Sequence, residues 1–179
     1  MKLNIGSGYR RIDGFINIDS VDCVDDNGNQ YTDIVLDIEK ERLPFEDNSV
    51  DEIACYEVLE HIGFDKNNPD GQEALIFVMN EMWRVLKPDG LLKGKVPREG
   101  GKGALRDPTH KRVFLVSTFD YFTGVNKHNP WRPMRPLNAD YRIKPWYRIK
   151  LDRGIRFILR PRKTKEYDKS KAQFNGLER

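Results

Sequence analysis

The opening segment Leu3–Ser20, LNIGSGYRRIDGFINIDS, places two short apolar runs so close together that a full crossover helix does not fit between them. Leu3–Ile5 and Phe15–Ile18 are typical of short buried strands, and a third run rich in β-branched residues follows at Thr32–Ile38. At about 3.3 Å per extended residue, Ser7–Gly14 is long enough to return the chain beside its first strand. The spacing therefore favours neighbouring strands joined by short connections.

Later segments continue this pattern. Apolar residues recur on one face of Gln72–Leu86, which predicts an amphipathic helix, and strands are predicted on either side at Val50–Cys55 and Leu91–Val96. Alternation within Tyr141–Leu151 and Ile155–Leu159 predicts a β-hairpin. We expect an α/β fold with a mostly parallel sheet, a C-terminal antiparallel hairpin and helices on both faces.

Local signals mark the ends of several elements. Asp70 and Glu73 resemble a capping box at the start of the amphipathic helix. A short helix is expected at Ser117–Phe122, with Ser117 as its cap. A helical turn is expected within Glu57–Ile62, and the glycines of Pro97–Gly103 indicate a loop.

A chain of 179 residues is long enough for one domain, which we assign to residues 1–160, with 98–138 as its substrate-loop region and 161–179 as a polar, flexible tail. No run approaches the roughly 18 apolar residues of a membrane span, so no membrane partner is expected. The two cysteines, Cys23 and Cys55, make no disulfide framework, and the N-terminus has no apolar secretion signal. These features favour a cytoplasmic protein.

Charge is unevenly distributed along the chain. Acids dominate from Asp13 to Glu60, and bases dominate from Arg132 onward, although the formal net charge is only +3. A basic C-terminal third can meet an anionic polymer, or it can be the solvated face of the hairpin.

Glycines and acids occur where the first strands end. Gly6 and Gly8 follow the first strand, and Asp19 and Asp37 close the next two. Ligands of open α/β sheets bind at the carboxyl ends of parallel strands, and glycine lets the backbone approach a ligand closely. A carboxylate at that edge can accept two hydrogen bonds from a ribose diol, so we expect one nucleoside to contact three successive strand ends.

The glycine pattern narrows the choice of nucleoside cofactor. Arg11 stands where a dinucleotide fingerprint has its third glycine, Asp19 comes too early for that fingerprint, and no phosphate-binding P-loop motif is present. A cofactor without phosphate fits better, and S-adenosylmethionine is such a molecule.

Four motifs then appear in order, and together they resemble the class I S-adenosylmethionine-dependent methyltransferases with a Rossmann-like sheet. They are LNIGSG…GFINIDS, DIVLDIEKERLPFEDNSVDEIACYEVLEHI, NEMWRVLKPDGLLKGKVP and RDPTHKRVFLVSTFDYF. The resemblance implies roles for several residues. Gly6, Ser7 and Gly8 would line the methionine portion of the cofactor, Asp19 would hold the ribose, Asp37 and Ile38 would contact the adenine, and Tyr56 and Glu57 would lie beside the methionine end.

The segment RDPTHKR supplies the candidates for chemistry. His110, oriented by Asp107, is a candidate general base, because histidine titrates near neutral pH. Arg106 and Arg112 are candidates for holding the substrate, as is His61 of VLEHI. The alternative is a structural turn, since Asp-Pro starts turns and His110 could bond only to the backbone.

The sequence thus predicts an enzyme that transfers a methyl group from S-adenosyl-L-methionine to a small-molecule or glycan acceptor. The alternatives are a cofactor-binding or scaffold protein with a methyltransferase fold, or a methyltransferase that acts on nucleic acid or protein, nucleic acid not being favoured. No metal site is expected, because the histidines at 61, 110 and 128 are far apart and lack ligand spacing.

Overall fold

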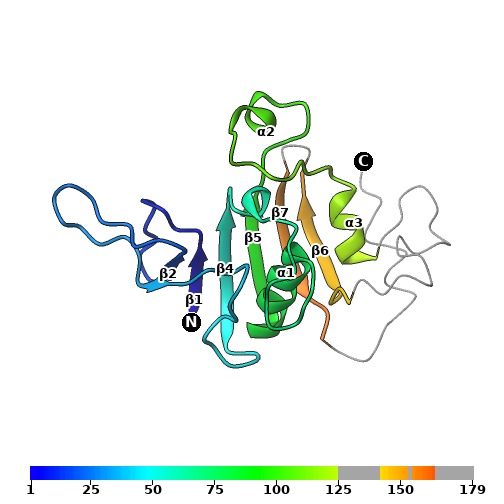
Figure 1. Ribbon diagram of the computed structural model, residues 1–179. Helices are drawn as coiled ribbons and strands as arrows, with labels where there is room; N and C mark the ends of the chain where they lie inside the picture. The colour runs from blue at the N-terminus through cyan, green and yellow to red at the C-terminus, as the bar shows by residue number, and fades with distance from the viewer. Residues whose placement is uncertain (125–141, 153–154, 164–179) are drawn as a thin grey trace.

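Seven strands form one sheet in the order β3-β2-β1-β4-β5-β7-β6 (Figure 1). The computed structural model describes residues 1–124, 142–152 and 155–163. Neighbouring strands from β3 to β5 pair in parallel, and β7 is antiparallel to both β5 and β6. The mostly parallel sheet with a C-terminal hairpin is therefore confirmed. The strands are β1 (Lys2–Ile5), β2 (Ile16–Asp19), β3 (Ile34–Val35), β4 (Val50–Tyr56), β5 (Leu86–Lys95), β6 (Trp146–Leu151) and β7 (Arg156–Pro161).

The helical elements are short apart from one. They are the 3-10 turn η1 (Leu59–His61) and the helices α1 (Ala74–Val85), α2 (Lys102–Arg106) and α3 (Thr118–Thr123). Helix α1 lies within the predicted amphipathic segment, whereas α2 begins inside the segment predicted as a glycine-rich loop. The capping box is not formed: Glu73 is the N-cap residue of α1 without a side-chain cap bond, and its carboxylate pairs instead with Arg112. Ser117 likewise precedes α3 without a side-chain cap bond.

One face of the sheet carries the core. Leu3, Ile53, Leu92 and Leu159 stand side by side across four strands, and all four are fully buried. Helices α1 and α3 pack on this face (Figure 1), and α3 reaches it through Phe119, whose ring centroid lies 4.8 Å from that of Phe157. Each such buried apolar side chain stabilises the fold by about 1.5–3 kcal/mol.

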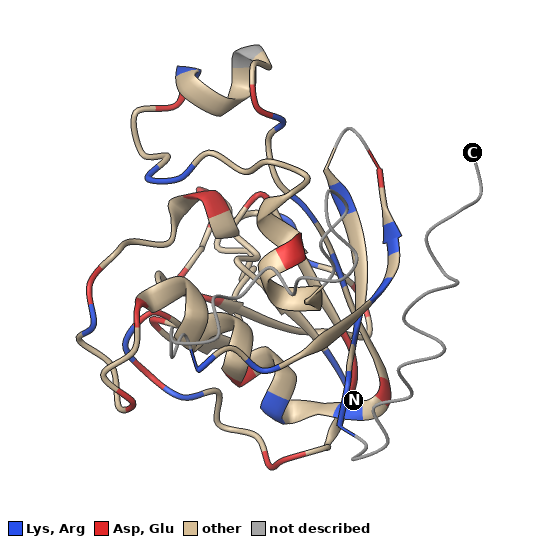
Figure 2. Cartoon of the chain, turned by 90° about the vertical axis from the view of Figure 1, so that its right-hand side faces the viewer, with Lys and Arg blue, Asp and Glu red and all other residues tan. Residues whose placement is uncertain are grey.

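The opposite face is polar. Asn4 pairs with Asn17 across β1 and β2, and Lys93 of β5 forms an ion pair with Glu52 of β4 at 2.9 Å. Figure 2 shows the helices on one side of the sheet and basic residues along its strands. Among the described residues the sheet-packing helices α1 and α3 share the apolar face, which differs from the expectation of helices on both faces. The connections 6–15 and 20–33 contain no helix, so the first of them covers Asn4 and Asn17 on the second face with irregular chain instead.

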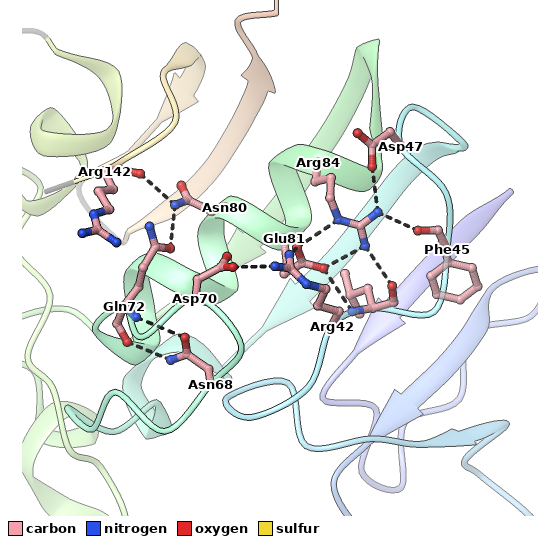
Figure 3. Close-up of polar contacts among 11 residues, drawn as sticks. Arg42, Phe45, Asp47, Asn68, Asp70, Gln72, Asn80, Glu81, Arg84 and Arg142 are labelled. Atoms are coloured by element: carbon pink, nitrogen blue, oxygen red, sulfur yellow. Dashed lines mark hydrogen bonds and ion pairs between the residues drawn. The ribbon is translucent and has the colours of Figure 1, made fainter.

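A buried ion-pair network fixes α1 to the loop before β4 (Figure 3). The Glu81 carboxylate is 4% exposed and accepts hydrogen bonds from Arg42 Nη1 at 2.9 Å and from Arg84 Nη2 at 2.8 Å. Arg84 also donates to the carbonyl oxygens of Leu43 and Phe45. The Glu81 carboxylate raises the pKa of Arg84, so this guanidinium stays charged.

The chain continues in contact with the domain beyond the predicted boundary at residue 160. Strand β7 ends at Pro161, and Lys163 Nζ donates to the Asn48 side chain at 2.6 Å and to the Arg84 carbonyl oxygen at 2.9 Å. The rest of the predicted tail, 164–179, and much of the predicted substrate-loop region lie outside the described residues. Both cysteines are buried free thiols, and no helix in the described ranges is long and apolar enough to cross a bilayer.

Candidate functional site

A tight turn of Gly6, Ser7 and Gly8, here called the glycine turn, follows β1. Gly6 and Gly8 have φ values of 67° and 47°, in the left-handed region that favours glycine. The amides of Gly6 and Ser7 donate to the Ile18 carbonyl oxygen at 2.8 and 3.1 Å, which holds the turn against β2. A Cβ on Gly6 would lie 2.3 Å from Val58 Cγ2, so Val58, the second residue after β4, packs directly on the glycine turn.

Asp19 lies where the sequence predicts it, at the glycine turn. Its Oδ2 accepts the Gly8 N–H at 2.8 Å, and its Oδ1 has only longer contacts, to Ser20 Oγ at 3.4 Å and Val21 N at 3.3 Å. Ser7 Oγ is buried without a hydrogen-bond partner among the described residues. The glycine turn thus holds a half-buried carboxylate and a buried, unsatisfied hydroxyl at the carboxyl ends of β1 and β2.

Asp37 is engaged within its own turn. Its Oδ2 pairs with Lys40 at 2.7 Å, and its Oδ1 accepts the Glu39 N–H at 3.0 Å. Ile38, the other predicted adenine contact, is half-buried against the core. The fold therefore brings Asp19 to the glycine turn, whereas Asp37 holds the turn after β3.

A cavity of about 500 Å³, here called the acceptor cavity, opens beside the ends of β4 and β5. Most of its lining comes from the segment that leaves the sheet at Arg98 and returns at Phe114, where these two residues form a backbone bridge. Tyr56 ends β4 and is exposed, and Glu57 follows it with a φ of 57°. The lining residues are Glu57, His61, Pro97, Gly103, Arg106, Asp107, Pro108 and His110.

Backbone hydrogen bonds bring the two histidines of the cavity together. The amides of Lys111 and Arg112 donate to the Glu60 carbonyl oxygen at 2.8 and 3.1 Å and so fix the turn 107–112 onto η1. The rings of His61 and His110 then meet edge to face with centroids 4.7 Å apart. His61 and His110 are far apart in the sequence, which argued against a shared metal site, but they lie side by side in the fold.

The predicted hydrogen bond between Asp107 and His110 is not present. Asp107 Oδ2 lies 3.9 Å from His110 Nε2, and Asp107 Oδ1 accepts hydrogen bonds from Thr109 Oγ1 at 2.6 Å and Thr109 N at 2.8 Å, which lower the pKa of this carboxyl. His110 Nδ1 lies instead 3.2 Å from the Ala104 carbonyl oxygen. Asp107 therefore shapes the turn, and a backbone carbonyl orients the imidazole.

Arg112 is a structural residue, which corrects its assignment to the substrate. Its Nε donates to the Ile62 carbonyl oxygen at 2.8 Å, its Nη2 contacts the Gly63 carbonyl oxygen and Glu73, and its guanidinium stacks 4.1 Å from the ring centroid of Phe64. These contacts leave its charge no reach into the cavity. Arg106, by contrast, lines the cavity.

The sequence analysis missed Glu60. This carboxylate is 1% exposed, and neither of its oxygens has a hydrogen-bond partner among the described residues. Burial raises the pKa of Glu60 to about 8, and the neighbouring Glu57 adds to the rise. An acid directly before a histidine in the otherwise apolar run VLEHI was the signal available in the sequence.

Comparison with known proteins gives one family match. Residues 17–93 match the family model described as a methyltransferase domain. No curated protein matches the chain. Among solved structures it is similar to the YcgJ protein from Bacillus subtilis, with 22% identity and a TM-score of 0.45 over 66% of this chain and 57% of YcgJ. It is also similar to the PH0226 protein from Pyrococcus horikoshii, with 13% identity and a TM-score of 0.43 over 89% of this chain and 81% of that one.

The chain spans little more than half the length of YcgJ, and the structural likenesses name no acceptor. The family match covers β2 to β5, and these strands stand in the sheet that the sequence motifs implied. By this match residues 17–93 are similar to a methyltransferase domain, the family that the sequence motifs resemble.

Proposed function

We propose that this protein binds S-adenosylmethionine at the glycine turn and transfers its methyl group to a polar small molecule or glycan in the acceptor cavity. The hydrogen bond from Gly8 N to Asp19 carries the proposal, because it holds a ribose-binding carboxylate at the turn where the methionine portion would lie. Ser7 Oγ, buried and without a partner, is a second polar atom that such a ligand would satisfy. These residues fit the cofactor.

The positions on either side of Val58 support this arrangement. Val58 packs on Gly6, and Glu57 lines the acceptor cavity, so the glycine turn and the cavity are neighbours across one residue of the chain. Tyr56 and Glu57 would lie at the methionine end, and Asp37 and Ile38 beyond the ribose, beside the adenine. For Asp37 this role requires exchange of its local contact with Lys40.

The cofactor supplies a methyl group on a positively charged sulfur, and the protein supplies alignment. An acceptor lone pair forms the new bond to the methyl carbon while the carbon–sulfur bond breaks and its electron pair stays on sulfur. Holding the two reactants in line contributes about 7–11 kcal/mol in well-oriented systems. A protonated acceptor must also lose a proton.

His110 is placed to take that proton. Because the Ala104 carbonyl oxygen can only accept, the contact at 3.2 Å assigns the proton to Nδ1 of His110 and leaves the lone pair on Nε2. The side chain lines the cavity, as does Arg106, which can hold an anionic group of the acceptor. A cavity of about 500 Å³ has the size of ordinary small-ligand sites, which supports a small-molecule or sugar acceptor.

Calorimetric titration with S-adenosylhomocysteine tests the cofactor site. The wild-type protein binds one equivalent, and Asp19→Ala weakens binding at least tenfold, or about 1.4 kcal/mol. Asp13→Ala, which removes an exposed acid of the same loop, leaves binding unchanged. Wild-type protein that binds no S-adenosylhomocysteine would contradict the proposal and leave a scaffold with a methyltransferase fold.

A transfer assay tests the acceptor. Labelled S-adenosylmethionine is incubated with fractionated metabolites, glycans and RNA, and label is expected in a small polar product. His110→Ala lowers turnover by about 10²–10⁴ if its proton transfer is needed. Undiminished turnover in that variant would remove His110 from the mechanism, and label confined to RNA would exclude the small-acceptor assignment.

A further inference from the structure

A cluster of three side chains with the composition of a metal centre lies at the acceptor cavity, and two of the three, His61 and His110, line it. Glu60, His61 and His110 each offer one ligand atom, and these atoms lie within 4.8 Å of one another. Two imidazoles and one carboxylate make up a common protein ligand set for divalent transition metals. We propose that these three residues bind a divalent transition-metal ion, with Zn²⁺ the first to test, at the inner end of the acceptor cavity.

The state of Glu60 is the first argument. Burying a carboxylate costs several kcal/mol unless partners compensate. Glu81 shows how this protein normally meets that cost, with two arginines and the backbone N–H of Leu43 around its oxygens (Figure 3). Glu60 is buried even more completely, yet no donor among the described residues bonds to its oxygens, and the side chain that it faces is another acid, Glu57. A cation between Glu60 and the two histidines would supply the missing partner.

The orientation of His61 is the second argument. Thr109 Oγ1 donates its single proton to Asp107 at 2.6 Å, so it must accept at its contact with His61 Nδ1, at 3.0 Å. The proton of His61 is therefore on Nδ1, and the lone pair is on Nε2. The chain Asp107, Thr109 and His61 is the kind of hydrogen-bonded support that orients metal-binding histidines.

His110 is held in the same way from another direction. Its Nδ1 donates to the Ala104 carbonyl oxygen, and its lone pair is also on Nε2. Both histidines thus have one nitrogen fixed by a supporting acceptor and the other free to coordinate. The Lys111 and Arg112 amides on the Glu60 carbonyl oxygen hold the two chain segments together, so the cluster does not depend on the ion for its assembly.

The position of the ion bears on the proposed function, which this part of the inference assumes. His61 and His110 line the acceptor cavity, so coordination positions not filled by protein would face it. A bound divalent cation lowers the pKa of a coordinated hydroxyl. The acceptor class is then narrowed to oxygen nucleophiles, and the His110 lone pair would bind the ion instead of taking the proton.

Metal binding is measured directly, without reference to activity. Protein freed of metal with a chelator is titrated with Zn²⁺ by calorimetry and with Co²⁺ by its visible absorption, with Mg²⁺ for comparison. The wild-type chain is expected to bind one Zn²⁺ or Co²⁺, and Glu60→Gln and His110→Ala to bind at least about 100-fold more weakly. Thr109→Val, which removes the support of His61 together with the hydroxyl contact to Asp107, weakens binding about 10–100-fold.

Two matched variants serve as controls. Glu99→Gln makes the same chemical change at an exposed position, and His128→Ala removes the remaining histidine of the sequence. Both retain wild-type affinity. Zn²⁺ binding by the wild type no tighter than by Glu60→Gln would overturn the proposal.

The two proposals fail separately. S-adenosylhomocysteine titrated into Glu60→Gln shows whether that variant is folded, and binding as in the wild type is expected. Asp19→Ala in turn retains its Zn²⁺ affinity. Loss of the metal result alone contradicts the metal site, and loss of the S-adenosylhomocysteine result alone contradicts the cofactor site.

Discussion

The backbone N–H of Gly8 donates a hydrogen bond to the side chain of Asp19 across 2.8 Å. This contact joins the turn after β1 to the last residue of β2, so the carboxylate and the turn move together. It uses one oxygen of Asp19 and leaves the other with only long contacts. The geometry of the glycine turn therefore sets the position of the acid.

Gly6→Ala is expected to destabilise the protein by about 2–4 kcal/mol. The new methyl group would overlap Val58, and the positive φ adds about 1–2 kcal/mol for a residue other than glycine. An alanine side chain at position 8 would face open space, so Gly8→Ala is destabilised only by its positive φ. Urea denaturation of both variants measures the difference. Equal costs would show that Val58 moves aside freely.

Glu60→Gln and Glu81→Gln are expected to behave differently in metal-free protein. Glu81→Gln breaks the pairs with Arg42 and Arg84 and costs about 3 kcal/mol, whereas Glu60→Gln breaks no hydrogen bond given by the described residues and changes stability by less than about 1 kcal/mol. Denaturation at neutral pH compares the two. A large cost for Glu60→Gln would reveal a structural partner.

Asp33→Asn is expected to make the free energy of unfolding depend less on pH in the acid range. Hydrogen bonds from Asn17 and an ion pair with Arg11 at 2.7 Å hold the pKa of Asp33 below its ordinary value. Because the folded-state pKa is the lower one, the unfolded chain binds more protons in acid. The stabilisation is present above about pH 4 and is lost as the pH falls through the folded-state pKa.

For this half-exposed group the contribution near pH 7 is about 1 kcal/mol after solvent screening. Urea midpoints of wild type and Asp33→Asn are compared from pH 7 downward, with Asp13→Asn as the control. The difference between the urea midpoints of wild type and Asp33→Asn is expected to disappear in acid. A gap that does not change with pH would mean that the effect is not electrostatic.

Arg112→Ala is expected to cost about 2–3 kcal/mol, since it leaves Glu73 and two carbonyl oxygens without their donor. Arg106→Ala removes the same type of side chain from the cavity wall and changes stability by less than about 0.5 kcal/mol. Thermal unfolding of the two variants measures both effects. An equally small cost for Arg112→Ala would restore it as a residue free to bind substrate.

The sheet and the glycine turn could be predicted from the sequence because their signals are local. Strand ends place Gly6, Gly8 and Asp19 at one edge without knowledge of distant contacts. The inner end of the cavity was different. His61 and His110 meet only because two amides cap the Glu60 carbonyl oxygen, a contact between segments distant in sequence. Glu60 lies within an apolar run, and an acid in such a run is ordinarily expected to be exposed to solvent.

The choice of hydrogen-bond partner, near or far along the chain, also explains the errors. Asp107 has a nearer donor in Thr109 than in His110, and Glu73 pairs with Arg112 before it can cap its own helix. Arg112 was a candidate for holding the substrate, but the carbonyl oxygens of Ile62 and Gly63 and the carboxylate of Glu73 hold its guanidinium. Composition and periodicity do not show which charged side chain finds a partner across the fold.

The bridge between Arg98 and Phe114 has a consequence for how such a protein can diversify. The segment between these two residues supplies most of the cavity wall and begins and ends at one point of the fold, so insertions at its exposed positions would leave the pairing of the strands intact.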